Sequence, residues 1–132
     1  MAIVVDTDVV SYLEKNDTRI KIYEKHLFNE TKFISFMTLA ELRRWMLERN
    51  WSEKRRAKFE NFISDNYGVI FADDRLCEIW AEIKSDAKKK GRPIDTADAW
   101  VAAVALMFDI PLVTHNRKHY ENVQGLKIIS ER

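Results

Sequence analysis

Four polar side chains of this sequence stand where they can do chemistry, and three of them are carboxylates. Asp6 and Asn116 each follow a short run of strand-forming residues. Glu41 lies in the helical segment after another such run, and Asp98 opens an apolar helix. Carboxylates that lie close together raise one another's pKa values, so a cluster of three needs a compensating cation. Oxygen ligands, with no Cys or His at zinc spacing, favour Mg²⁺ or Mn²⁺. Such an ion beside basic patches indicates phosphodiester hydrolysis, in which the metal activates water and stabilises the oxyanion.

The acids of the apolar helix also have an ordinary structural explanation. Asp95 is placed to cap the helix and Asp98 to complement its dipole, each stabilising it by roughly 0.3–1 kcal/mol. Asp95 lies three residues before Asp98 and therefore on the same helix face. It either caps the helix or joins the metal shell, and capping is the favoured interpretation.

Strand-like runs alternate with helical patterns along the whole chain. The runs that read as strands are residues 2–5, 32–37, 67–71, 111–114 and 126–129. The segments that read as helices are residues 7–13, 19–28, 38–49, 51–66, 75–90 and 98–108, with a short turn or helix at 116–120. Thr38 and Glu41 match a capping box at the start of the third helix.

This alternation predicts a three-layer α/β/α fold with a central, mostly parallel sheet of four to five strands and right-handed crossovers. Ligands of such sheets bind at the carboxyl ends of the strands. If the strands before Asp6 and Asn116 adjoin in the sheet, the three carboxylates and the amide meet at one rim. The sequence therefore places the candidate site at that rim.

Composition indicates a single soluble domain over residues 1–132. The chain is 46% hydrophobic and 33% charged, with three Gly and two Pro, which does not indicate disorder or a linker. Its longest apolar run, Ala99–Phe108, is about half of a membrane span, and the acidic N-terminus is not typical of a signal peptide. The lone Cys77 cannot form an internal disulfide, which favours a reducing, cytoplasmic setting.

Basic residues are unevenly distributed, although the net charge is only +1. One group occupies residues 43–58 and a second occupies residues 84–92. Such groups suit phosphate contacts. Solvated helix faces explain them equally well, so both interpretations stay open.

Four sequence fragments carry a resemblance to a known family. They are Val4–Val9 (VVDTDV), Thr38–Leu42 (TLAEL), Asp98–Ala103 (DAWVAA) and Leu112–Asn116 (LVTHN). In their order and spacing, over nearly the whole chain, they resemble the PIN-domain nucleases. The likeness is greatest to the VapC-type toxin ribonucleases of type II toxin–antitoxin systems.

The resemblance implies a Mg²⁺-dependent endoribonuclease, with Asp6, Glu41 and Asp98 in the acidic cluster and Asn116 as the fourth catalytic position. Asp6 and Asp98 would bind the metal directly, and Glu41 would bind through water or orient the attacking water. Asn116 would position a water molecule or a phosphate oxygen. Further candidates for positioning water or substrate are Thr7, Thr114 and Asp95.

This chain departs from the family pattern at two positions. Asn116 is neutral, so a second metal ion should bind more weakly than in a four-acid site. His119, before Tyr120, stands where the family often has an Asp. Two-metal occupancy is therefore in doubt, and one-metal catalysis is the expectation.

The resemblance further implies an RNA substrate, a cognate antitoxin and a homodimer in the cytoplasm, with no membrane association. An exposed apolar stripe of Leu42, Trp45, Met46 and Leu47 would contribute to the antitoxin groove. Two other functions stay open. One is a non-toxin nuclease of the same fold that acts in RNA maturation, and the other is an interaction module with weak catalysis, of which Asn116 would be the first sign.

Overall fold

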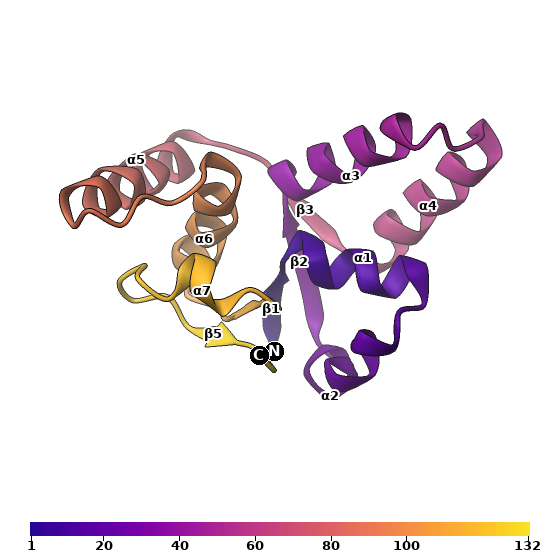
Figure 1. Ribbon diagram of the computed structural model, residues 1–132, viewed down its shortest axis with the longest axis horizontal. Coiled ribbons are helices and arrows are strands. Elements are labelled where there is room, and N and C mark those ends of the chain that lie inside the picture. Colours follow the sequence, from indigo (N-terminus) through magenta and orange to yellow (C-terminus); the bar gives the residue numbers. More distant parts are fainter.

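A parallel five-stranded sheet runs through the middle of the molecule in the computed structural model, which describes residues 1–132 (Figure 1). The strands are β1 (Ala2–Val5), β2 (Thr31–Ser35), β3 (Gly68–Ile70), β4 (Leu112–Val113) and β5 (Ile128–Ile129). Their order across the sheet is β3-β2-β1-β4-β5, and every neighbouring pair is parallel. The predicted fold class is confirmed, with β1 and β4 side by side.

Helices cover both faces of this sheet. They are α1 (Thr7–Lys15), the 3₁₀ helix η1 (Thr18–Ile22), α2 (Glu24–Leu27), α3 (Phe36–Glu48), α4 (Glu53–Asn66), α5 (Asp74–Lys89), α6 (Thr96–Phe108) and α7 (Arg117–Tyr120). Alternate residues of a strand point to opposite faces. Val5 and Val113 therefore join the core beneath α1 and α3, whereas Val4 and Leu112 join the core beneath α5 and α6.

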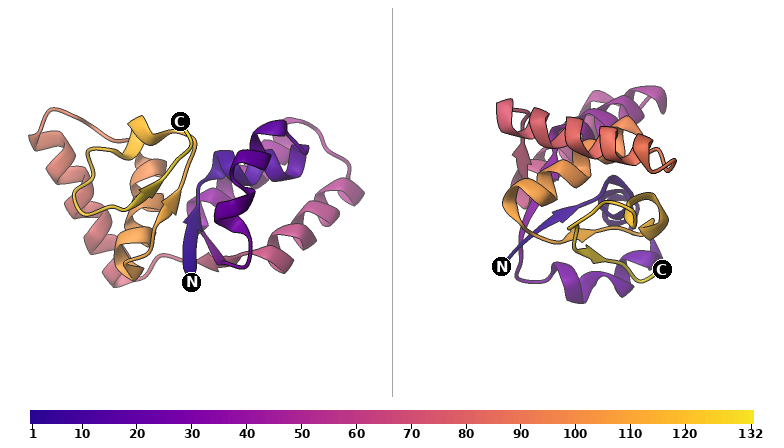
Figure 2. Two further views of the ribbon diagram at one scale, coloured as in Figure 1. Left: turned by 90° about the horizontal axis from the view of Figure 1, so that it is seen from below. Right: turned by 90° about the vertical axis from the view of Figure 1, so that its left-hand side faces the viewer.

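The apolar helix α6 lies between α5 and the sheet, as predicted from its composition (Figure 2). Its residues Ala99 and Val101–Ala105 are almost fully buried. Small alanines allow the close approach to β1, β2 and α5. Asp98, in the first turn, is thus carried by one of the best-packed elements of the molecule. No helix is long and apolar enough to cross a membrane.

Two helix predictions are wrong in detail. Helix α3 begins at Phe36, capped by Ser35 Oγ, which accepts a hydrogen bond from the Met37 amide at 3.0 Å. Thr38 is therefore a buried residue inside the helix and no capping box forms, because β2 passes into α3 without a loop. The predicted helix at 19–28 is split into η1 and α2 at Tyr23, whose fully buried side chain lies in the core.

Candidate active site at the carboxyl ends of β1 and β4

A cavity of about 460 Å³ opens where β1 and β4 end. Pairing of Val5 with Val113 brings the residues after both strands together, and the Asp6 amide donates to the Val113 carbonyl at 2.9 Å. The cavity is lined by all four predicted catalytic residues and by several of their neighbours, namely Asp6, Thr7, Asp8, Glu41, Asp98, Asn116 and His119. The predicted convergence at one rim is therefore what the fold produces.

Asp6 is the most enclosed acid of the site, with 6% of its surface exposed. Its carboxylate accepts hydrogen bonds from Thr114 Oγ1 at 2.8 Å and from the Thr7 amide at 2.8 Å. Burial raises its pKa to about 7, and the nearby charges of Asp8 and Asp98 act in the same direction. Thr114, which is fully buried, opposes that rise by donating its hydrogen bond.

Asp8 is a site residue that the sequence reasoning missed. Its Oδ2 accepts hydrogen bonds from Asn116 Nδ2 at 2.9 Å and from the His115 amide at 3.1 Å. Burial raises the pKa of Asp8 as well. The available signal was its spacing, because a second acid two residues after Asp6 lies in the first turn of the helix that leaves the same strand end.

Asp98 is held by α7, which the sequence did not connect with it. Tyr120 donates a hydrogen bond to Asp98 Oδ1 at 3.1 Å, and His119 Nδ1 lies 3.2 Å from Asp98 Oδ2. Burial raises the pKa of Asp98, while His119 and Tyr120 lower it. The histidine noted above as a departure from the family pattern is thus a direct partner of the predicted metal ligand.

Glu41 reaches the site from the second turn of α3. The Thr7 hydroxyl donates to Glu41 Oε1 at 3.0 Å, and Thr38 Oγ1 lies 2.9 Å from the same hydroxyl. Burial raises the pKa of Glu41, and the charge of Asp98 adds to the effect. Thr7 therefore positions the carboxylate of Glu41.

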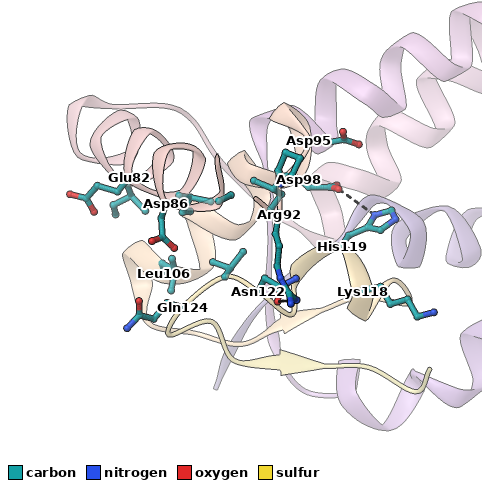
Figure 3. Close-up of a pocket in the computed structure, with 16 residues that line it drawn as sticks. Glu82, Asp86, Arg92, Asp95, Asp98, Leu106, Lys118, His119, Asn122 and Gln124 are labelled. Atoms are coloured by element: carbon teal, nitrogen blue, oxygen red, sulfur yellow. Dashed lines mark hydrogen bonds and ion pairs between the residues drawn. The ribbon is translucent and has the colours of Figure 1, made fainter. Parts of the chain in front are cut away.

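Asp95 lies outside this cavity. It occupies the N-cap position of α6, as predicted, but its exposed side chain makes no capping hydrogen bond, so the expectation that the carboxylate caps the helix is wrong. The carboxylate instead points away from the helix (Figure 3). Asp95 lines a neighbouring pocket and acts on the site through its charge, which raises the pKa of Asp98.

The donor set suits a divalent cation in type and in charge. Burial and neighbouring acids raise the pKa values of Asp6 and Asp98, so a bound cation would favour their ionised forms. No three His, Cys, Asp or Glu side chains lie close enough together to hold a metal ion between them. The aspartate carboxylates are directed at protein donors instead, Asp6 at Thr114, Asp8 at Asn116 and Asp98 at Tyr120. The metal-binding roles of Asp6 and Asp98 stay a prediction.

Three basic side chains also line the cavity and form its basic wall, namely Lys15, Arg44 and Arg49. Lys15 and Arg49 both lie against the ring of Trp45, with Nζ and Cζ at 4.6 and 3.7 Å from its centroid. The predicted exposed stripe on α3 is wrong, because Leu42 and Met46 are buried against the sheet and only Leu47 is largely exposed. Helix α3 brings charges of both signs to the cavity, namely Arg44 with the carboxylates of Glu41 and Glu48, and Arg44 pairs with Glu48 at 3.2 Å.

Comparisons with known proteins point to one family. A model described as "PIN domain" matches residues 3–125. The chain is similar to "Ribonuclease VapC1" of Haemophilus influenzae strain R2866, at 29% identity over 96% of each chain. It is also similar to "VapC ribonuclease Y4jK" of Sinorhizobium fredii, at 30% identity over 97% of this chain and 96% of the relative.

Solved structures give the same result. The structure of VapBC-1 from nontypeable Haemophilus influenzae contains a chain with a TM-score of 0.83 and 26% identity, and 98% of each chain is covered. A chain of VapBC2 from Rickettsia felis, bound to a DNA fragment from its promoter, also has a TM-score of 0.83, with 23% identity and 98% of each chain covered. At that identity, the second likeness supports the fold alone.

Proposed function

The chain belongs to the PIN-domain family, and we propose that it is a Mg²⁺-dependent endoribonuclease, the toxin of a type II toxin–antitoxin pair. The observation that carries this proposal is the convergence of Asp6, Glu41, Asp98 and Asn116, from four separate parts of the chain, in one cavity. The curated relatives named above support the reaction, because they are called ribonucleases.

Asp6 and Asp98 would hold Mg²⁺, and Mn²⁺ is an alternative with the same ligand preference. When bound, the ion supplies activation of water and stabilisation of charge on the phosphate. The chain's own residues prepare these ligands. Thr114 holds the carboxylate of Asp6, and His119 and Tyr120 hold that of Asp98. Such supporting contacts fix the orientation of metal ligands.

The remaining polar residues position water and substrate. Glu41, held by Thr7, orients the attacking water, and Asn116 supports the site through Asp8. Substrate phosphates lie on the basic wall of Lys15, Arg44 and Arg49, which lines the same cavity as the acids.

The solved structures that resemble this chain indicate which partners to propose. The solved relative from nontypeable Haemophilus influenzae is a VapBC assembly, which supports a cognate antitoxin for this chain. We also expect a homodimer in the cytoplasm. Toxicity on expression, with rescue by the product of an adjacent gene, tests the toxin role. Cleavage of RNA without toxicity would favour the RNA-maturation alternative instead.

RNA cleavage tests the catalytic proposal directly. Wild type is compared with Asp6→Asn and Asp98→Asn on single-stranded RNA, with Mg²⁺ and with EDTA. We expect each substitution to lower the rate at least about 100-fold, because each removes a charged metal ligand. Asp65→Asn is the matched control, since Asp65 is an exposed acid of α4 outside the cavity. Equal rates in all four proteins, or full activity in EDTA, would overturn the proposal.

A further inference from the structure

A second pocket, of about 510 Å³, lies beside the candidate active site (Figure 3). It is enclosed by α5, by the loop before α6 and by the segment after α7. Asp98 and His119 line both this pocket and the active-site cavity, so the two spaces adjoin. A group that extends beyond Asp98 and His119 lies next to the second pocket, whose volume is that of an ordinary small-molecule site.

The walls of this pocket differ in chemistry. Ile83, Leu106 and Val123 give it an apolar surface. Asp86 projects from α5 toward the interior, and Arg92 crosses the pocket from the opposite side (Figure 3).

Arg92 and Asp86 differ in the contacts that they make within the protein. Arg92 Nη1 donates to Asn122 Oδ1 at 3.0 Å, which links the two loops of the pocket. Asp86 pairs only with Lys90, at 2.9 Å and with both side chains about half exposed. Such a surface pair contributes little, so the carboxylate is free to accept hydrogen bonds from a ligand.

The balance of charge selects the kind of ligand. The charged ends of Glu82, Asp95 and Lys118 point away from the pocket, so the charges that face its interior from opposite sides are those of Asp86 and Arg92 (Figure 3). A phosphate group would meet the carboxylate of Asp86 as well as Arg92 and is therefore poorly matched, and we place the phosphates on the basic wall of the first cavity. A neutral, flat ligand that offers N–H donors fits both the apolar walls and the carboxylate.

We propose that this pocket receives an unpaired base next to the scissile phosphate, and that Asp86 reads its edge. This inference rests on the proposed ribonuclease function. Single-stranded RNA is recognised through splayed bases that pack on side chains and hydrogen-bond along their edges. A carboxylate accepts from amino-bearing edges, as Asp and Glu do from cytosine. Guanine is the best match, because its ring N–H and amino group offer two adjacent donors to the two oxygens of Asp86.

Cleavage of a randomised single-stranded RNA by wild type, Asp86→Asn and Asp65→Asn tests the base preference. Wild type and the Asp65→Asn control should favour guanine over uracil at one position beside the cut. Asp86→Asn should reduce that preference about tenfold, as expected for the loss of one bidentate contact, while it still cleaves RNA. The proposal is overturned if wild type shows no preference there, or if Asp86→Asn retains it.

Binding of mononucleotides gives a readout that is independent of cleavage. Guanosine monophosphate should shift the NMR signals of the Asn122 amide and of Arg92 Nε in wild type, and uridine monophosphate should shift them less. Asp86→Asn should weaken the response to guanosine monophosphate and leave that to uridine monophosphate unchanged. If wild type cleaves no RNA, the proposed function fails, whereas equal responses to both nucleotides refute the base pocket.

Discussion

Ionisation of the buried carboxyl group of Asp6 has an electrostatic cost. It is buried and lies near two other acids, and its pKa is raised from the usual 3.8 to about 7. At neutral pH, ionised Asp6 opposes folding unless a cation balances its charge. An apolar residue in place of Asp6 would be buried at a lower free-energy cost. A buried acid beside its hydrogen-bond donor Thr114 is therefore consistent with a functional role.

The pH dependence of stability in EDTA follows from this shift. Between about pH 4 and pH 7 the native state binds more protons than the unfolded state, so stability should fall as pH rises through this window. One carboxyl contributes a slope of up to about 1.4 kcal/mol per pH unit. Asp6→Asn should give a flatter profile and a more stable protein at pH 8. Urea unfolding at several pH values measures this, and identical profiles would contradict the assignment.

Added Mg²⁺ provides the complementary measurement. If Asp6 is a metal ligand, Mg²⁺ should stabilise wild type at pH 8 in proportion to the logarithm of its concentration above the dissociation constant. Asp6→Asn should lose most of this gain. An equal gain in both proteins would mean that the ion binds elsewhere.

Thr114 permits a second prediction at the residue scale. Its hydroxyl donates to Asp6 and accepts from the Asn116 amide at 3.0 Å, so Thr114→Val removes both contacts at nearly constant volume. We expect a loss of about 1–3 kcal/mol in the free energy of unfolding, because buried polar groups are left without partners. RNA cleavage should fall as well. Thr114→Ser retains the hydroxyl and should retain more of the activity, and the reverse order would refute the role of the hydroxyl.

At the scale of elements, the junction between β2 and α3 sets the position of Glu41. The strand ends at Ser35 and the helix begins at Phe36, so no loop absorbs a change in direction. Ser35 caps the helix from a fully buried position. The orientation of α3, and with it the placement of Glu41 and Arg44, therefore depends on this cap.

Paired cap substitutions test the junction. Ser35→Ala should destabilise the protein by about 1 kcal/mol, the usual value for a lost N-cap, and should also lower cleavage. Ser52→Ala removes the corresponding cap of α4, a hydrogen bond from the Arg55 amide at 3.2 Å, on a helix that carries no site residue. It should destabilise similarly without loss of cleavage at a temperature where both proteins are folded. Equal activity losses would show that stability alone is responsible.

At the scale of the whole molecule, the distribution of charge matters more than its sum. The net charge of +1 gives little general attraction for RNA. The acids lie at the sheet rim, and Lys15, Arg44 and Arg49 line the same cavity. RNA affinity should therefore depend on a few local phosphate contacts.

The salt dependence of RNA affinity measures the number of those phosphate contacts. Three phosphate contacts on single-stranded RNA predict a slope of about −2 for the logarithm of affinity against the logarithm of salt concentration. Arg44→Gln should reduce the magnitude of this slope by about 0.7. Arg75→Gln, at an exposed position of α5 outside the cavity, should leave it unchanged. Fluorescence anisotropy with Asp98→Asn in EDTA avoids cleavage during the measurement, and equal slopes for both variants would contradict the basic wall.

The sequence by itself determined the fold class and much of the site. Periodicity of apolar residues encodes strands and helices locally, so the alternation of elements was readable. The positions of Asp6 and Asn116 after strands followed from the same pattern, and the rule for parallel sheets then placed them at one rim. Likewise, the apolar character of α6 indicated its central position.

Only the tertiary structure decided which groups meet. The sheet order sets β1 beside β4, which brings Asp8 to Asn116 and Thr114 to Asp6 across more than a hundred residues of chain. The contact of His119 with Asp98, and the second pocket beside it, likewise depend on how α7 packs against α6. Local sequence cannot specify such pairs, because their geometry results from the packing of whole elements against a shared core.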